Sequence, residues 1–138
     1  MYRKIDHIAI AVRSLESSAK IYAHMLALQK WDTEEVEQQR TRVAFLPLGE
    51  SRIELIAPTD DTSPVASFLA KRGEGLHHVC FQVDDLAEEM SRLAAAGMRL
   101  VDPRPRPGAG GALIAFVHPS SACGVLIELS QPGSGAVR

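Results

Sequence analysis

The sequence has few cysteines, no marked excess of either charge and no long apolar run. Its two cysteines, Cys80 and Cys123, form no CxxC pair and are too few for a disulfide framework. Cys80 lies in an apolar run and is expected to be a buried free thiol. The formal net charge of -2 gives no basic face, so no nucleic acid partner is expected. No apolar stretch approaches the roughly 20 residues that cross a bilayer, so no membrane partner is expected.

The overall composition indicates a folded domain. Hydrophobic residues make up 46% of the 138 residues and charged residues 23%, values typical of globular rather than disordered chains. A chain of this length can bury a substantial core as one domain over residues 1–138. Residues 1–12 hold no apolar run typical of a secretion signal, and we therefore expect a cytoplasmic protein.

The most informative pattern is an internal repeat. The segments His7–Val12 and His78–Val83 each place a histidine before a short apolar run, which is typical of a buried strand. A polar cap and a helical pattern follow each segment, over about residues 15–28 and 86–96. The expected buried face of the first helix consists of Ile21, Met25 and Leu28. That of the second helix consists of Leu86, Met90 and Leu93, with Asp85 as its N-cap and Gly97 at its end.

Each copy then continues as strands, at about residues 42–46 and 53–56 in the first and 112–117 and 125–129 in the second. The closing strands match closely, since one reads IELIAP and the other IELSQP. The order strand, helix, then two or three strands therefore occurs twice, and duplication explains it. We expect module one at about residues 5–58, a linker with a short helix at residues 59–75, and module two at about residues 76–131.

Four polar residues recur at matching places in the two copies. His7 and His78 are 71 residues apart, and Glu54 and Glu128 are 74 apart. A single such histidine or glutamate is usually just solvated, but both glutamates are flanked by apolar residues. A buried carboxylate is costly unless it is paired or bound to a cation. Two nitrogen and two oxygen ligands suit a divalent ion such as Co²⁺, Mn²⁺, Ni²⁺ or Zn²⁺, so a shared metal site is predicted.

The repeated motifs resemble the vicinal oxygen chelate (glyoxalase) superfamily and, within it, the methylmalonyl-CoA epimerases. The segments that carry the resemblance are Ile5–Val12, Val43–Gly49, Ile53–Pro58, Ser63–Leu69, Gly75–Val79, Phe116–Pro119 and Gly124–Leu129. The resemblance implies an α+β fold in which two tandem βαβββ modules form a curved mixed sheet around a central metal site. It also implies a homodimer and a divalent ion, with Co²⁺ the first choice, held by His7, Glu54, His78 and Glu128. His78 is preferred to His77 because it aligns with His7.

The implied activity interconverts (2R)- and (2S)-methylmalonyl-CoA by proton abstraction at C2 through a metal-stabilised enolate. Inversion requires proton exchange on both faces of the intermediate. Glu128 is the first candidate base, by its resemblance to the family residue with metal and proton-transfer duties. At least one member of the family has a second glutamate on the strand that corresponds to Arg42–Ala44, and this sequence has no acid there. For the second base we therefore favour Glu54, with a metal-bound water or His118 as alternatives.

The CoA thioester substrate needs further contacts, and two regions are predicted to supply them. Residues 102–111 hold three prolines and three glycines, which indicates a long loop. Arg104 and Arg106, with the backbone amides at Gly110 and Gly111, are expected to line the acyl or pantetheine end. His118 is the other predicted substrate contact. Two other functions remain open: a glyoxalase I-type lactoylglutathione lyase, and a non-catalytic binding module of the same fold.

Overall fold

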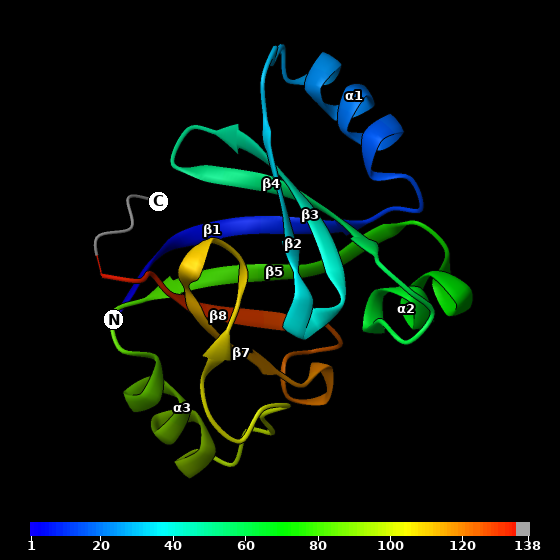
Figure 1. Ribbon diagram of the computed structural model, residues 1–138. Coiled ribbons are helices and arrows are strands. Elements are labelled where there is room, and N and C mark those ends of the chain that lie inside the picture. Colours follow the sequence, from blue (N-terminus) through cyan, green and yellow to red (C-terminus); the bar gives the residue numbers. More distant parts are fainter. Residues whose placement is uncertain (135–138) are drawn as a thin grey trace. The chain divides into compact units, whose positions relative to one another are not determined.

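The computed structural model describes residues 1–134, in which two modules share one order of elements (Figure 1). The first comprises β1 (Tyr2–Ala11), α1 (Leu15–Met25), β2 (Asp32–Val36), β3 (Thr41–Leu48) and β4 (Ser51–Pro58). The second comprises β5 (Gly75–Val83), α3 (Leu86–Ala95), β6 (Arg106–Pro107), β7 (Leu113–Val117) and β8 (Ile127–Gln131). Helix α2 (Pro64–Arg72) joins them, and short 3-10 turns lie at Glu37–Gln39, Ala109–Gly111 and Pro119–Ser121. The predicted α+β fold with two βαβββ modules is confirmed.

Strand pairing is the same in both modules. The first strand lies parallel to the last, as β1 does to β4 and β5 does to β8, and the remaining pairs are antiparallel. The strand order is β2-β3-β4-β1 in one module and β6-β7-β8-β5 in the other. A parallel pair needs a crossover, which the helix and the intervening strands supply. The strand that carries the histidine therefore always lies beside the strand that carries the glutamate.

By its internal packing the chain divides into two compact units, and the division falls inside β1. The first unit is His7–His77, and the second is Met1–Asp6 together with His78 onward. In the second unit, Arg3 Nε donates to Asp84 Oδ1 at 2.7 Å, and the Asp84 N–H donates to the Met1 carbonyl at 3.1 Å. The start of β1 is thus held beside the end of β5. The single-domain arrangement over residues 1–138 remains a prediction.

Helix α1 packs by a different face from the one expected. Its buried residues are Leu15, Ala19 and Ala23, and the first two pack against the buried side chains of β3 and β4. Ile21 is 60% exposed and Met25 62% exposed, so the predicted face was wrong for these two residues. Only Leu28 packs against the core as expected. The small alanine side chains let the helix lie close to the sheet, and the larger residues therefore fall on the outside.

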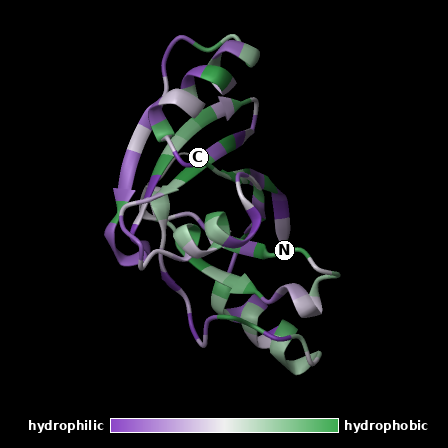
Figure 2. Cartoon of the chain, turned by 90° about the vertical axis from the view of Figure 1, so that its right-hand side faces the viewer, coloured by the Kyte–Doolittle hydropathy of each residue, from purple (hydrophilic) through white to green (hydrophobic). Residues whose placement is uncertain are grey.

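Helix α3 follows its prediction. Asp85 accepts a hydrogen bond from the Glu88 N–H at 3.0 Å, which caps the helix. Leu86, Met90 and Leu93 are buried, and Gly97 ends the helix with φ of 82° in the left-handed region. Helix α2 also begins as expected, with Ser63 as its N-cap before Pro64. Figure 2 shows hydrophilic and hydrophobic residues mixed along the helices and strands.

Strands β2 and β6 were not predicted, and both are edge strands. β2 reads DTEEV, pairs only with β3 in its module and is exposed except at Val36. β6 is two residues long and contains Pro107, which lacks an N–H for the ladder. Neither carries the apolar pattern of a buried strand. Among the described residues, no helix is long and apolar enough to cross a membrane.

Two ion pairs of the second unit should make stability depend on pH. Hydrogen bonding from Arg3 lowers the pKa of Asp84, and hydrogen bonding from Arg92 lowers the pKa of Glu89. A lowered pKa in the folded state stabilises the fold above the unfolded-state pKa, and this contribution is lost as the pH falls through the folded-state pKa. The urea midpoint should therefore fall between about pH 5 and pH 3. In Arg3→Gln this fall should be shallower, and an unchanged pH profile would contradict the role of Asp84.

Candidate metal centre

The first predicted ligand pair lies on adjacent strands of the first unit. His7 on β1 and Glu54 on β4 are both buried, and His7 Nδ1 is 3.1 Å from Glu54 Oε2. In the parallel register Glu54 lies opposite Ala9, two residues beyond His7. Side chains two residues apart on a strand point to the same face. The imidazole and the carboxylate therefore meet on one side of the sheet.

The second predicted pair repeats this arrangement within the second unit. His78 on β5 and Glu128 on β8 are buried, and His78 Nε2 is 3.3 Å from Glu128 Oε1. Glu128 lies opposite Cys80, which is again two residues beyond the histidine. The same register offset in both modules is what a duplicated structural unit should give. Each module thus offers one nitrogen and one carboxylate ligand at the same relative position.

The structure also separates the two neighbouring histidines. The His77 ring packs on Phe68 of α2, with ring centroids 4.8 Å apart, whereas His78 pairs with Glu128. The two rings thus have different neighbours, and the preference for His78 over His77 as a ligand remains a prediction. Whether the two His–Glu pairs form one centre remains a prediction.

Each glutamate has a phenylalanine opposite it, and an arginine lies over that ring. In the first unit Phe45 lies opposite Glu54, and the Arg52 guanidinium is 5.7 Å from the Phe45 ring centroid. Arg52 Nη2 also donates to Glu54 Oε2 at 2.5 Å and Nε donates at 3.2 Å. The Glu54 carboxylate is therefore oriented by both an imidazole and a guanidinium.

In the second unit the arginine binds a different carboxylate. Phe116 lies opposite Glu128, and its ring meets His78 edge-to-face with centroids 5.2 Å apart. Arg106 lies over the Phe116 ring at 5.6 Å, but its Nε donates to Asp102 rather than to Glu128. Sequence reasoning missed Arg52 and Asp102, because their contacts depend on strand register and on the path of a loop.

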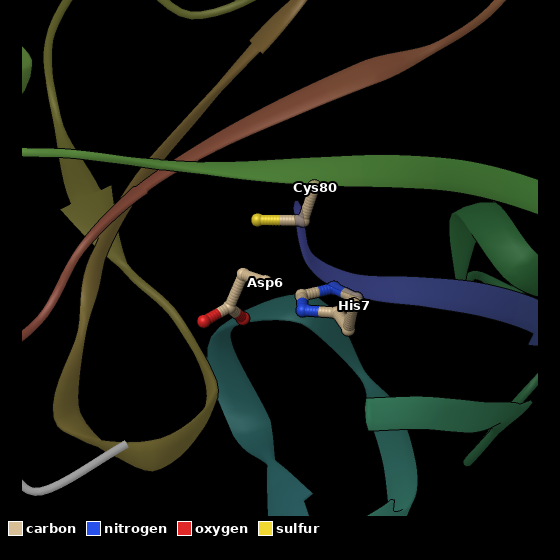
Figure 3. A group of neighbouring side chains, drawn as sticks. All are labelled: Asp6, His7 and Cys80. Atoms are coloured by element: carbon tan, nitrogen blue, oxygen red, sulfur yellow. The ribbon is translucent and has the colours of Figure 1, made fainter. Parts of the chain in front are cut away.

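A further buried carboxylate precedes the first ligand. Asp6 is fully buried, and one of its oxygens lies within 4.8 Å of the buried Cys80 thiol (Figure 3). The expectation of a buried free thiol at Cys80 is confirmed. Figure 3 also shows His7, which follows Asp6 along β1. The signal that could have revealed Asp6 is a lone acid within the apolar run that begins at Ile5.

The predicted substrate contacts lie at the end of β7 and in the loop before it. His118 Nδ1 accepts from the Ser120 N–H at 3.0 Å, so the neutral imidazole carries its proton on Nε2. Arg104 is exposed, and Gly110 and Gly111 both have positive φ. Within residues 1–134, Arg104 makes no hydrogen bond, ion pair or ring contact with a predicted ligand. Arg106, which begins β6 two residues later, lies over the ring that touches His78.

The donor atoms of the two pairs fit a borderline divalent ion. An imidazole nitrogen and a carboxylate oxygen from each module give the mixed ligand set that Co²⁺, Mn²⁺, Ni²⁺ and Zn²⁺ accept. All four ligand side chains are buried, and a buried carboxylate needs a cation or hydrogen-bond donors. Each pair therefore offers side chains that can act as metal ligands, and a metal site remains a prediction.

Comparison with known proteins points to one family. The family model of the Glyoxalase/Bleomycin resistance protein/Dioxygenase superfamily matches residues 6–116. The ethylmalonyl-CoA/methylmalonyl-CoA epimerase of Cereibacter sphaeroides is 35% identical over 95% of this chain and 99% of its own. The crystal structure of methylmalonyl-CoA epimerase from Mycobacterium tuberculosis has a TM-score of 0.89 and 37% identity, covering 94% and 87% of the two chains. A methylmalonyl-CoA epimerase solved with methylmalonyl-CoA and NH4⁺ gives a TM-score of 0.91 at 31% identity, covering both chains completely.

Proposed function

This chain belongs to the glyoxalase, bleomycin resistance protein and dioxygenase superfamily, and we propose that it is a metal-dependent methylmalonyl-CoA epimerase. It would interconvert the (2R) and (2S) forms by moving the proton at C2. The observation that carries the proposal is the repeated buried pair, His7 with Glu54 and His78 with Glu128. Methylmalonyl-CoA epimerases match nearly the whole chain, which favours methylmalonyl-CoA over the substrates of other members of the superfamily.

The two pairs together would hold one divalent ion, with Co²⁺ the first choice and Mn²⁺, Ni²⁺ or Zn²⁺ as alternatives. When bound, the ion would supply positive charge to the thioester oxygen and the carboxylate of the substrate as the C2 proton leaves. The buried surroundings of the four side chains exclude water, which strengthens such electrostatic stabilisation. A homodimer in the cytoplasm is the expected setting, and both points remain predictions.

Glu128 and Glu54 would carry out the proton transfer. Glu128 would remove the C2 proton on one face of the acyl group. Glu54, held in place by Arg52 and His7, would start as the protonated acid and give its proton to the opposite face, so that it ends as the carboxylate while Glu128 ends protonated. The reverse reaction exchanges the two roles. A base on each face is the simplest arrangement that inverts a carbon centre.

Deuterium exchange tests this function directly. Metal-loaded protein incubated with (2S)-methylmalonyl-CoA in D₂O should yield the (2R) epimer with deuterium at C2. Mass spectrometry measures the incorporation, and chiral analysis measures the inversion. Absence of both, with metal present, would exclude the epimerase. Turnover of a glutathione hemithioacetal instead would favour the lyase, and ligand binding without either reaction would favour a binding module.

A further inference from the structure

A buried aspartate in the loop before β7 fixes one arginine of the second unit. Asp102 is 8% exposed, and each of its carboxylate oxygens accepts a hydrogen bond of 2.7 Å. Oδ1 accepts from Arg106 Nε, and Oδ2 accepts from the Phe116 N–H. Because the second donor belongs to the backbone of β7, Asp102 cannot move without disturbing that strand. The Arg106 guanidinium is therefore anchored to the sheet and not merely to a loop.

The anchored guanidinium is one aromatic ring away from the predicted metal ligands. Arg106 lies 5.6 Å from the Phe116 ring centroid, and the same ring meets the His78 ring at 5.2 Å with an interplanar angle of 88°. Phe116 is also the residue opposite Glu128. The Arg106 side chain is 37% exposed, so a ligand can reach it. The Arg106 guanidinium is thus held near the His78–Glu128 pair by a residue that is bonded to β7.

Arg106 and Arg52 occupy comparable places but have different tasks. Arg52 is only 14% exposed, and two of its nitrogens donate to Glu54 itself. Arg106 uses Nε for Asp102, which leaves its two terminal amino groups for a second anion. Two parallel N–H groups match the two oxygens of a carboxylate. The geometry of Arg106 is therefore that of a binding residue, whereas Arg52 is engaged with a ligand of the predicted centre.

We propose that Arg106, positioned by Asp102, binds the free carboxylate of the acyl group of the substrate. The inference rests on the proposed function and names the group that selects malonyl-type thioesters over simple acyl thioesters. An arginine at this place also favours the negative charge that grows on the acyl group as C2 loses its proton. Asp102 acts through Arg106 and is a positioning residue.

Two ligands that differ only in the carboxylate provide the test. Methylmalonyl-CoA carries it, and propionyl-CoA does not, while both carry the same CoA phosphates. Calorimetry on metal-loaded Arg106→Gln should show methylmalonyl-CoA affinity reduced by about 10–100-fold. Its affinity for propionyl-CoA should stay within about threefold of the wild type, which is close to the noise of additive substitutions. Arg13→Gln, which removes an exposed arginine that has no predicted contact with the substrate, should change neither affinity.

Two further variants keep the test independent of folding. Arg106→Lys retains the charge but loses the paired N–H groups, and it should lose part of the preference for methylmalonyl-CoA. Asp102→Asn should weaken the preference for methylmalonyl-CoA over propionyl-CoA while leaving the charge of Arg106 in place. If Asp102 acts through Arg106, the double variant Asp102→Asn with Arg106→Gln should show the same preference as Arg106→Gln alone. Thermal melting of every variant confirms that it is folded.

The outcomes separate this inference from the proposed function. An equal loss of affinity for both thioesters would mean that Arg106 meets a CoA phosphate, and it would overturn the carboxylate assignment. Unchanged binding in Arg106→Gln would overturn it as well. If wild-type protein exchanges deuterium while Arg106→Gln discriminates the two ligands normally, only the inference fails. If the wild type neither exchanges deuterium nor prefers the carboxylated thioester, both fail.

Discussion

Replacing Glu128 with glutamine is expected to reduce epimerisation by about 10²–10⁴-fold, the range for loss of a general base. Glutamine keeps the size of the side chain but cannot accept the C2 proton. Glu128 is buried and lies 3.3 Å from His78 Nε2, so the substitution also removes a predicted charged ligand from the second pair. The rate of inversion, followed by chiral analysis at saturating metal, measures the effect.

The comparison with Glu54→Gln separates the two proposed bases. If each glutamate serves one face, Glu128→Gln should still exchange the C2 proton of one epimer for deuterium without inverting that epimer. Glu54→Gln should then do the same for the other epimer. If Glu54 is a ligand only, Glu54→Gln should retain inversion once metal is restored. Loss of both exchange and inversion in Glu54→Gln with metal bound would contradict assignment of Glu54 to a single face.

Glu89→Gln is the matched control for these substitutions. Glu89 is a buried glutamate of the second unit, like Glu128, but it lies on α3 and bonds to Arg92. Its loss should lower stability and leave epimerisation at saturating metal within about threefold of wild type, in keeping with additivity between distant sites. If Glu89→Gln lost as much activity as Glu128→Gln, the effect of Glu128→Gln would reflect general loss of folding.

The two His–Glu pairs were predictable from sequence because strand alternation and an internal repeat are both visible there. A strand shows its buried face by alternation, and a repeat shows which residues hold equivalent places. Aligning the two halves of the chain therefore matches His7 with His78 and Glu54 with Glu128. The close approach within each pair then follows from the parallel strand pairing that the βαβββ order requires.

The parts that sequence did not predict depend on contacts made by neighbouring elements. Helix α1 carries apolar residues on two faces, and only the sheet beneath decides that Ala19 and Ala23 are buried while Ile21 is not. Arg104 and Arg106 are two residues apart in a segment rich in proline and glycine, and they look equivalent in sequence. The hydrogen bonds of Asp102 single out Arg106, and they require the register of β7.

Removing the metal is expected to abolish activity and to lower the melting temperature. Binding to the folded state alone stabilises a protein by about 2.7 kcal/mol when the free ligand is 100 times its Kd. For a chain of this size that corresponds to a fall of roughly 5–10 °C on chelation. The physical reason is that Glu54 and Glu128 would remain as buried carboxylates with less compensating positive charge. Differential scanning calorimetry with and without EDTA measures the change, and added Co²⁺ should reverse it.

Histidine variants show whether the predicted ligands account for that shift. His78→Ala should lose most of the metal-dependent rise in melting temperature, because it removes one of the four predicted ligands, all of which are buried. His24→Ala is the matched control, since His24 is an exposed histidine in the last turn of α1. The control should keep the full shift and the full metal content by elemental analysis. A melting temperature that does not respond to chelation in the active wild type would rule out a metal held by these four side chains.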